Sequence, residues 1–402
     1  MNEQIKIILK IFSSEVLLKI VLGFTSILIA RKLESFVYAD FFFFITITNL
    51  CVNIPSSFFN KFLFIDENKL IIDKFNNLTI LTFLSLVALI FLFLILLITP
   101  FSNLYLYVFA IFIILIRIIY LYNQTILQSK LNFRKLYIRE FTRVTFYSLP
   151  SIVYLFLALT PKIEIIFIIL FLSFFLIEIT NKFRLNFSFS IKKLLNLLNV
   201  FFNEKNKYII FYTSSLMVVT TIDTLMLKSL SNKIELSNFG AAFTLYSFIM
   251  LGLSSIHKYV LPKTSMSKVS EFQDILSPIF KLGYLIILFF LIGIFISKSV
   301  FELIYGIDKY PKAYFLFNIL SLSAVFSFFF SPYSNLLNKL GLFKFQLIIN
   351  ISGLTLMIIL NFLFIPNYGA LAVVVVNLIT YFLINFSFFL KAKQIIISDS
   401  DL

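Results

Sequence analysis

The stretch TTIDTLMLKSLSNKIELSNFGAAFTLYSF, from Thr220 to Phe248, decides the fold. Its pattern indicates an apolar helix that carries one acid, Asp223, then a short polar turn and a second apolar helix. A weaker copy of this layout, SILIARKLESFVYADFFFFITITNL, runs from Ser26 to Leu50. Because each copy opens a series of apolar segments, we predict a chain built as two halves, with the second half opening at this stretch.

Composition places the chain in a membrane. Hydrophobic residues make up 60% of the 402 residues and charged residues 13%, and the mean hydropathy is +1.00. A soluble domain could not cover that much apolar surface. The single cysteine, Cys51, excludes an internal disulfide, and the single histidine, His257, leaves no cysteine–histidine set for a metal. We predict an all-α polytopic membrane protein that needs no cofactor.

Apolar runs of about 20 residues, the length that spans a bilayer, predict about 12 transmembrane helices in two lobes of six. The first lobe covers residues 1–181, with helices at about 13–31, 36–60, 76–98, 104–122, 140–160 and 163–181. The second covers residues 207–402, with helices at about 207–229, 238–260, 280–298, 312–337, 344–365 and 368–390. An even number of spans in each lobe implies a pseudo-twofold axis along the membrane normal. The first span lacks a signal-peptidase site, so we expect it to stay in the membrane.

The connection between the lobes, residues 182–206, contains IKKLLNLLNVFF. Its leucines recur near helical spacing beside Lys192 and Lys193, which favours an amphipathic helix lying on the cytoplasmic surface. A plain basic linker is the alternative.

The distribution of Lys and Arg predicts the orientation, because basic residues are retained on the cytoplasmic side. With the N terminus inside, 25 of the 34 basic residues fall on the cytoplasmic side and 8 on the outer side. We therefore expect both termini in the cytoplasm. This topology and contact with anionic lipid account for the net charge of +15, so we expect no nucleic-acid partner.

Four segments carry a resemblance to a known family: IARKLESFVYADF at 29–41, IDTLMLKSLSNKIELSNFGAAF at 222–243, LIYGIDKYPKAYFLFNILSLS at 303–323 and NFLFIPNYGALAVVVVNLITYFL at 361–383. Over nearly its whole length the chain resembles polysaccharide repeat-unit flippases of the Wzx type. These O-antigen transporters belong to the MOP superfamily, which also holds MATE multidrug transporters and lipid II flippases.

The resemblance implies a transporter of the bacterial inner membrane rather than an enzyme. Its cargo would be an undecaprenyl-diphosphate-linked oligosaccharide, moved from the inner to the outer leaflet by alternating access during O-antigen and lipopolysaccharide synthesis. A polysaccharide polymerase and the chain-length machinery are then possible partners.

Basic residues in or beside the predicted spans are the candidate contacts of the diphosphate, because an anion that crosses hydrocarbon needs positive partners. They are Lys19, Arg117, Arg139, Arg143 and Lys258. Each has a structural alternative. Arg117 can extend to the cytoplasmic interface, Arg139 and Arg143 can anchor their helix at the surface, and Lys258 can be an ordinary interface residue next to His257.

Two acids are the candidates for ion coupling. Glu15 lies four residues before Lys19, so the two form either a structural ion pair or a cargo-binding lysine whose charge Glu15 tunes. Asp223 has only threonines as close polar neighbours on its helix, and a buried acid there can bind a proton or Na⁺. An interhelical hydrogen bond or ion pair is the alternative for Asp223.

Other polar residues in the spans have predicted roles as well. Tyr120, Tyr122, Asn123 and Gln124 suit hydrogen bonding to a sugar or head group. Glu140 can pair with Arg143, and Glu178 with Lys182, at helical spacing. Helices can bend at Pro55, Pro150 and Pro332.

Three classes of function stay open. The first is the lipid-linked oligosaccharide flippase. The second is a MATE-like antiporter of drugs, metabolites or cations, in which we would expect intramembrane acids to outnumber bases; here the bases predominate. The third is a membrane enzyme such as a polymerase or ligase, which the short predicted outer loops argue against. No glycine-rich phosphate loop is present, so we expect no use of bound ATP.

Overall fold

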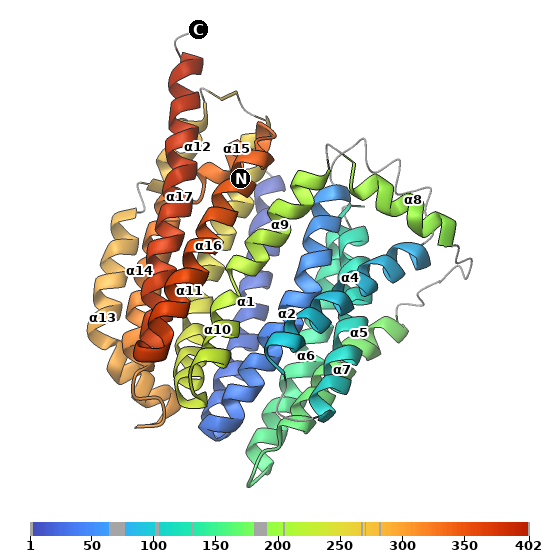
Figure 1. Ribbon diagram of the computed structural model, residues 1–402, viewed down its shortest axis with the longest axis vertical. Coiled ribbons are helices and arrows are strands. Elements are labelled where there is room, and N and C mark those ends of the chain that lie inside the picture. Colours follow the sequence, from blue (N-terminus) through green and yellow to red (C-terminus); the bar gives the residue numbers. More distant parts are fainter. Residues whose placement is uncertain are drawn as a thin grey trace. The chain divides into compact units, whose positions relative to one another are not determined.

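The computed structural model describes residues 3–63, 77–100, 104–129, 132–180, 191–203, 206–266, 268–269, 271–280, 283–306 and 308–400 (Figure 1). Within these ranges the chain forms helices joined by turns, with no strand. Contacts divide it into two compact units, unit 1 from Met1 to Thr221 and unit 2 from Ile222 to Leu402. The predicted all-α fold is confirmed.

Unit 1 begins with two long helices, α1 (Glu3–Lys32) and α2 (Ser35–Leu63). The helices that follow are α4 (Asn77–Ile98), α5 (Leu104–Ser129), α6 (Phe133–Leu157), α7 (Ile163–Thr180), α8 (Ile191–Phe201) and α9 (Lys207–Val219). α2 packs against α4, α5 and α9, while α6 packs against α1 and α7. This packing brings α5, α6 and α7 together, and among the described residues these helices carry the buried charged side chains of unit 1, Arg139 and Glu178.

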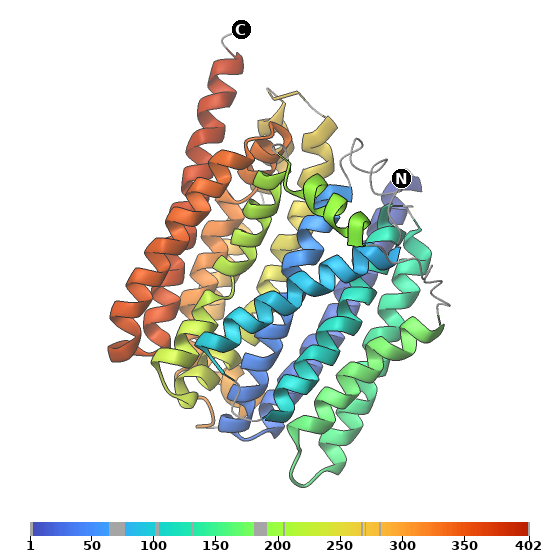
Figure 2. The same cartoon turned by 45° about the vertical axis from the view of Figure 1, so that its right-hand side comes forward.

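Unit 2 is built around its last two helices, α16 (Phe343–Tyr368) and α17 (Ala370–Ser400), which pack against each other along their lengths (Figure 2). The preceding helices are α10 (Ile222–Leu230), α11 (Lys233–Met266), α12 (Phe272–Phe280), α13 (Gly283–Tyr305), α14 (Ala313–Phe330) and α15 (Tyr333–Lys339). α14 packs against α11, α13 and α17, and α10 packs against α16.

Six helices of the described ranges are long and apolar enough to cross a membrane. They are Ser35–Asn60, Asn77–Ile98, Tyr105–Ser129, Ala313–Phe330, Phe343–Tyr368 and Ala370–Ser398. The pair α9 and α10 reaches the same length and hydropathy together, as one interrupted span.

The exposed surface of the helices is apolar and the interior holds polar groups, which is the arrangement expected in lipid. On α16, Phe362 is 63% exposed, whereas Gln346, Asn350 and Asn361 are fully buried. On α4, Leu97 is 66% exposed. These faces and the apolar spans make the chain a multi-pass membrane protein.

The predicted amphipathic helix between the lobes exists as α8. Its apolar side is anchored, because Phe201 is fully buried and lies edge-on to Phe58 of α2 and stacked on Phe83 of α4. Lys192 and Lys193 are exposed on α8. α8 lies at the same end of unit 1 as the start of α1 (Figures 1 and 2).

Several predicted helices differ in extent from the structure. α1 begins at Glu3 rather than near residue 13, α6 begins at Phe133 rather than near residue 140, and α17 continues to Ser400 rather than ending near residue 390. The span predicted at 207–229 is interrupted at Thr220 and Thr221, and the span predicted at 312–337 breaks at Ser331 and Pro332. The helix predicted at 104–122 continues to Ser129. A short helix that the sequence did not predict, α12, precedes α13.

The division into units falls after α9, because α9 packs on α2. The lobes drawn from the sequence place α9 with the second half and residues 182–206 between the halves. Those lobe boundaries stay a prediction.

Candidate functional site

Asp223 lies at the break between α9 and α10. The hydroxyls of Thr220 and Thr221 donate to the carbonyl of Met217 at 2.8 and 2.9 Å, and the N–H of Thr221 bonds to Val218 three residues back. These bonds tighten the last turn and end α9. Asp223 therefore falls in the first turn of α10, where the free N–H groups of a helix start favour a negative charge.

The side chain of Asp223 is 2% exposed and is held by amides. Asn361 of α16 donates from Nδ2 to Oδ1 of Asp223 at 2.8 Å, and Asn377 of α17 also hydrogen-bonds to the carboxylate. Among the described residues, no Lys or Arg forms a salt bridge with Asp223. The interhelical hydrogen bond that was the alternative for Asp223 is therefore present in the structure.

Three further oxygen atoms lie on α16 and α17, the helices that hold this acid. Oδ1 of Asn361, Oδ1 of Asn377 and Oγ1 of Thr380 are buried, and none of them has a hydrogen-bond partner among the described residues. Thr380 follows Asn377 by three residues on α17, so both side chains lie on one helix face. Buried polar atoms in folded proteins almost always have a partner. A carboxylate together with amide and hydroxyl oxygens is a set of ligand atoms that suits a small hard cation or a hydrogen-bonded water.

A second polar cluster lies inside unit 1 around a buried ion pair. Arg139 of α6 pairs with Glu178 of α7, and both side chains are 7% exposed. Asn123 of α5 donates to the other carboxylate oxygen of Glu178 at 2.6 Å. Glu178 was expected to pair with Lys182, which lies outside the described residues. Its partners in the described part of the chain come from α5 and α6, so the Arg139–Glu178 pair and the amide of Asn123 join three helices.

A second ion pair lies one turn further along α6. Arg143 contacts Glu140 at 3.0 Å, as predicted, and Gln124 of α5 donates to Glu140 at 3.0 Å. The ring of Tyr120 lies near both guanidiniums, with its centroid 4.7 Å from Cζ of Arg139 and 5.8 Å from Cζ of Arg143.

Arg117 is the third arginine of this cluster, and it forms no salt bridge with a described residue. It lies near the middle of α5, about 20 Å along the helix axis from Leu104 at 1.5 Å per residue. Its guanidinium lies 5.7 Å from the ring centroid of Phe174, and Arg143 lies 5.2 Å from the same ring. Of the residues that the structure describes, none offers Arg117 a carboxylate. Three arginines therefore share two carboxylates, Glu140 and Glu178.

Three side chains of the polar run after Arg117 form hydrogen bonds to neighbouring helices of unit 1. Tyr122 donates to Asn77 of α4 at 2.7 Å, while Asn123 and Gln124 bond to Glu178 and Glu140. α5 is thus extended to Ser129 by side-chain bonds to α4, α6 and α7.

The remaining candidate residues are spread over other helices. Lys19 of α1 is partly exposed. Glu15 lies on α1, and His257 and Lys258 lie on α11, but their side chains are outside the described residues. The Glu15–Lys19 pair and the cargo contacts of Lys19 and Lys258 stay predictions.

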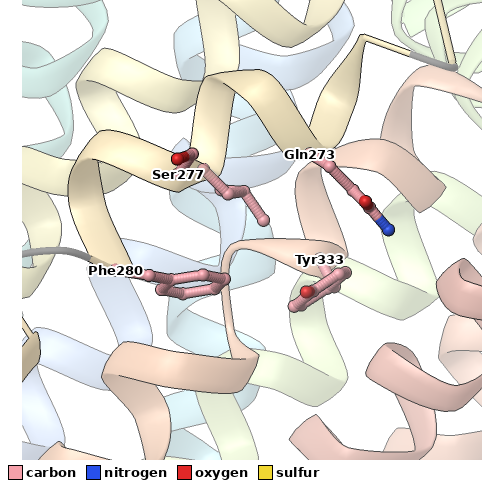
Figure 3. Close-up of a pocket in the computed structure, with 5 residues that line it drawn as sticks. Gln273, Ser277, Phe280 and Tyr333 are labelled. Atoms are coloured by element: carbon pink, nitrogen blue, oxygen red, sulfur yellow. The ribbon is translucent and has the colours of Figure 1, made fainter.

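A cavity of about 490 Å³ opens near α12. Gln273, Leu276, Ser277 and Phe280 line it from α12, and Tyr333 lines it from α15 (Figure 3). Figure 3 shows the rings of Phe280 and Tyr333 beside each other, with Gln273 and Ser277 further along α12. Its lining combines an aromatic pair with two uncharged polar side chains.

Sequence reasoning found Asp223 and the arginines but missed Asn361, Asn377 and Thr380. The sequence does contain a signal for the two amides, because they lie inside strongly apolar helices. Polar side chains within spanning segments carry a free-energy cost and are therefore candidates for a functional role.

Comparison of folds gives the class of protein to which this architecture corresponds. The structure is similar to the lipid II flippase MurJ in an inward closed conformation, with a TM-score of 0.67 and 18% identity, over 95% of this chain and 87% of that one. It is also similar to a multidrug resistance MATE family transporter of the MOP superfamily in an inward-facing conformation, with a TM-score of 0.62 and 12% identity, over 95% of both chains.

The chain therefore has the all-α membrane fold of MurJ and MATE proteins. No family model matches the sequence. No curated protein matches it at a significant level.

Proposed function

We propose that the protein is a flippase for a lipid-linked oligosaccharide. The observation that carries the proposal is the excess positive charge inside unit 1, where Arg117 has no carboxylate partner among the described residues. A charged side chain in the middle of a membrane-spanning helix carries a free-energy cost that a binding role would explain. A diphosphate supplies the missing negative charge and enough acceptor oxygens for a guanidinium.

The proposed cargo is an undecaprenyl-diphosphate-linked repeat unit, moved from the inner to the outer leaflet of the bacterial inner membrane. The similarity to a lipid II flippase supports a lipid-linked cargo, and the sequence resemblance favours an O-antigen or related polysaccharide unit. Alternating access of the lobes at 1–181 and 207–402 would move it, and a polymerase would receive it. Lys19 and Lys258 would add positive charge from α1 and α11.

The proposed coupling site consists of the carboxylate of Asp223 and the amide oxygens of Asn361 and Asn377, which we call the oxygen cluster. Asn361 and Asn377 each present an unpaired Oδ1, so a Na⁺ ion or a protonated carboxylate would satisfy the buried oxygens. Cation binding would neutralise Asp223 within the apolar interior of unit 2 and so lower the free energy of one conformation. Glu15 is the second proposed coupling residue.

Reconstituted protein tests the cargo assignment. Proteoliposomes containing a fluorescent undecaprenyl-diphosphate oligosaccharide should show protein-dependent movement of the label between leaflets. Arg117→Met should slow it about tenfold or more, because a charge-assisted hydrogen bond is worth about 1.5–3 kcal/mol, and Arg117→Lys should retain part of the rate.

Arg134→Met is the matched control, since Arg134 is exposed at the start of α6. Wild-type flipping by Arg117→Met would contradict the role of Arg117. Absence of flipping by the wild-type protein with every lipid diphosphate tested would contradict the function itself.

A MATE-like antiporter is the second candidate, and the structural similarity to a MATE transporter together with the buried Asp223 favours it. In that case a cationic dye should exchange against Na⁺ or protons in the same proteoliposomes. Lipid-linked saccharide should not compete with the dye.

A further inference from the structure

A second cavity, of about 220 Å³, lies in unit 2 where α13 ends and α14 begins. Phe301, Tyr305, Tyr310, Tyr314 and Pro311 form its apolar part. Lys298, Glu302 and Asp308 supply its charged groups, and Gly306 completes the lining. At about 30 Å³ per water molecule the space holds roughly seven waters. It is therefore suited to one small polar molecule rather than to a drug-sized ligand, which needs about 300 Å³ or more.

The aromatic floor of this cavity is rigid. Tyr305 is 3% exposed and donates its hydroxyl to the carbonyl of Ala241 on α11 at 3.1 Å. Tyr310 lies edge-on to Tyr305, with ring centroids 5.4 Å apart, and Phe301 lies 5.6 Å from Tyr305. Tyr314 is only partly buried, so its ring is the accessible wall.

The acidic rim depends on a strained turn. Asp308 has a φ of 64° and is the only non-glycine residue of the described chain with a positive φ, while Gly306 has a φ of 98°. A positive φ is uncommon outside glycine, and such residues gather at binding sites. Asp308 and Glu302 are both exposed, so their carboxylates can accept hydrogen bonds from a ligand.

We infer that this cavity, which we call the tyrosine pocket, binds one neutral pyranose residue, a hexose or an N-acetylhexosamine. Aromatic rings pack on the apolar C–H face of such a ring. The two carboxylates can accept hydrogen bonds from the sugar hydroxyls, and the ammonium group can donate to them. With two acids against one base, the lining opposes the additional carboxylate of a uronic acid.

This inference deepens the proposed function and rests on it for its biological meaning, because the ligand would be a sugar of the lipid-linked cargo. The lining residues of the tyrosine pocket come from the end of α13, the start of α14 and the connection between them, and these helix ends lie at the end of unit 2 opposite α12 and α15 (Figures 1 and 2). The predicted topology places that end on the outer side of the membrane, to which the proposed transport would deliver the saccharide.

The absence of tryptophan from the 402 residues allows a direct binding test. Tyr314→Trp places a single fluorophore in the tyrosine pocket of the full-length protein in nanodiscs. Tyr368→Trp is the matched control, because Tyr368 is an exposed tyrosine of the same unit that does not line the pocket. Methyl glycosides of glucose, galactose and N-acetylglucosamine are titrated, together with methyl glucuronoside.

The Tyr314→Trp protein should show a saturable fluorescence change with at least one neutral glycoside and a weaker response to glucuronoside. Adding Asp308→Asn or Glu302→Gln should raise the Kd about tenfold, as expected when a hydrogen bond to a charged group is lost. Asn also tolerates positive φ, so Asp308→Asn keeps the turn. Tyr368→Trp should not respond.

Equal responses of the two reporters, a linear response, or Asp308→Asn and Glu302→Gln without effect would overturn the inference. Nanodiscs that carry the same sugar on a lipid distinguish the source of the ligand. A response that depends on Asp308 with both the free and the lipid-linked sugar supports recognition of the sugar itself. If the protein flips the lipid-linked sugar but the Tyr314→Trp fluorescence does not change, sugar binding in the tyrosine pocket is excluded and the proposed function stands.

Discussion

At the scale of single residues, we expect the stability of the protein to depend on the buried Arg139–Glu178 ion pair. Glu178→Gln leaves the buried guanidinium of Arg139 without its carboxylate, and breaking a buried pair costs about 3–5 kcal/mol. We expect the thermal midpoint in detergent to fall accordingly. The double variant Arg139→Met with Glu178→Leu should recover much of the loss, because neither charge then remains buried.

Glu140→Gln is the control for this prediction. Its carboxylate is 21% exposed and pairs with the partly exposed Arg143, so the effect should be smaller. An equal loss in both single variants would show that burial does not set the cost.

The proposed coupling role of Asp223 predicts that the protein binds a cation. If the oxygen cluster binds Na⁺, the ion should raise the thermal midpoint of the wild-type protein, with about 2.7 kcal/mol of stabilisation at a hundred times the Kd. Asp223→Asn should remove this response. Asp274→Asn, at an exposed acid of α12, should retain it.

A wild-type midpoint that responds to pH and not to Na⁺ would indicate a proton instead. An unchanged response to both ions in Asp223→Asn would exclude the coupling role.

At the scale of elements, one carboxylate ties three helix ends of unit 2 together. Glu235 of α11 accepts from Nζ of Lys312 at 2.5 Å and from the N–H of Ala370 at 3.0 Å. The junction of α16 and α17 is the single residue Gly369, with φ 56° and ψ −132°. A Cβ on Gly369 would lie 2.6 Å from Oε2 of Glu235.

Gly369→Ala should therefore cost about 3 kcal/mol or more, because backbone strain adds to the loss of the bonds of Glu235. Gly341→Ala is the comparison, since Gly341 also has a positive φ but has nothing within 4 Å of an added Cβ. It should lose about 1–2 kcal/mol. Equal losses in chemical unfolding would mean that Glu235 adjusts freely.

The helices also show which parts of the fold can be predicted from the sequence. Apolar runs predict the existence of the long helices because the bilayer fixes their length. The break at Thr220 and Thr221 is set by hydroxyl bonds to Met217 that periodicity does not reveal. The extension of α5 depends on partners such as Asn77 and Glu178, which are distant in the sequence.

The candidate site was predictable only in part for the same reason. An acid in an apolar helix stands out, so Asp223 was found from the sequence. Its partner Asn361 is 138 residues away, and only packing of α10 on α16 brings them together. Likewise, helical spacing predicted the Arg143–Glu140 pair but could not predict that Arg139 meets Glu178.

At the scale of the whole molecule, the predicted orientation can be tested with single cysteines. Cys51 is buried, so Cys51→Ala gives a background without reactive thiols. α8 and the connection between α6 and α7 lie at opposite ends of unit 1 (Figures 1 and 2), and Lys193→Cys and Lys162→Cys place one cysteine in each. An impermeant maleimide added to intact cells with a permeabilised outer membrane should label Lys162→Cys but not Lys193→Cys.

After lysis, both variants should react. The reverse pattern in intact cells would place the termini outside, contrary to the distribution of Lys and Arg.

The shortness of α10 has a consequence for how the protein is made. Its nine residues extend about 14 Å, too little to cross a bilayer alone, and they carry Asp223 into the membrane before α16 and α17 exist. The carboxylate of Asp223 therefore lacks the amides of Asn361 and Asn377 while more than a hundred further residues are synthesised. A chain that ends before α16 should consequently be a substrate for membrane quality control, since the acid then has neither of these amide partners.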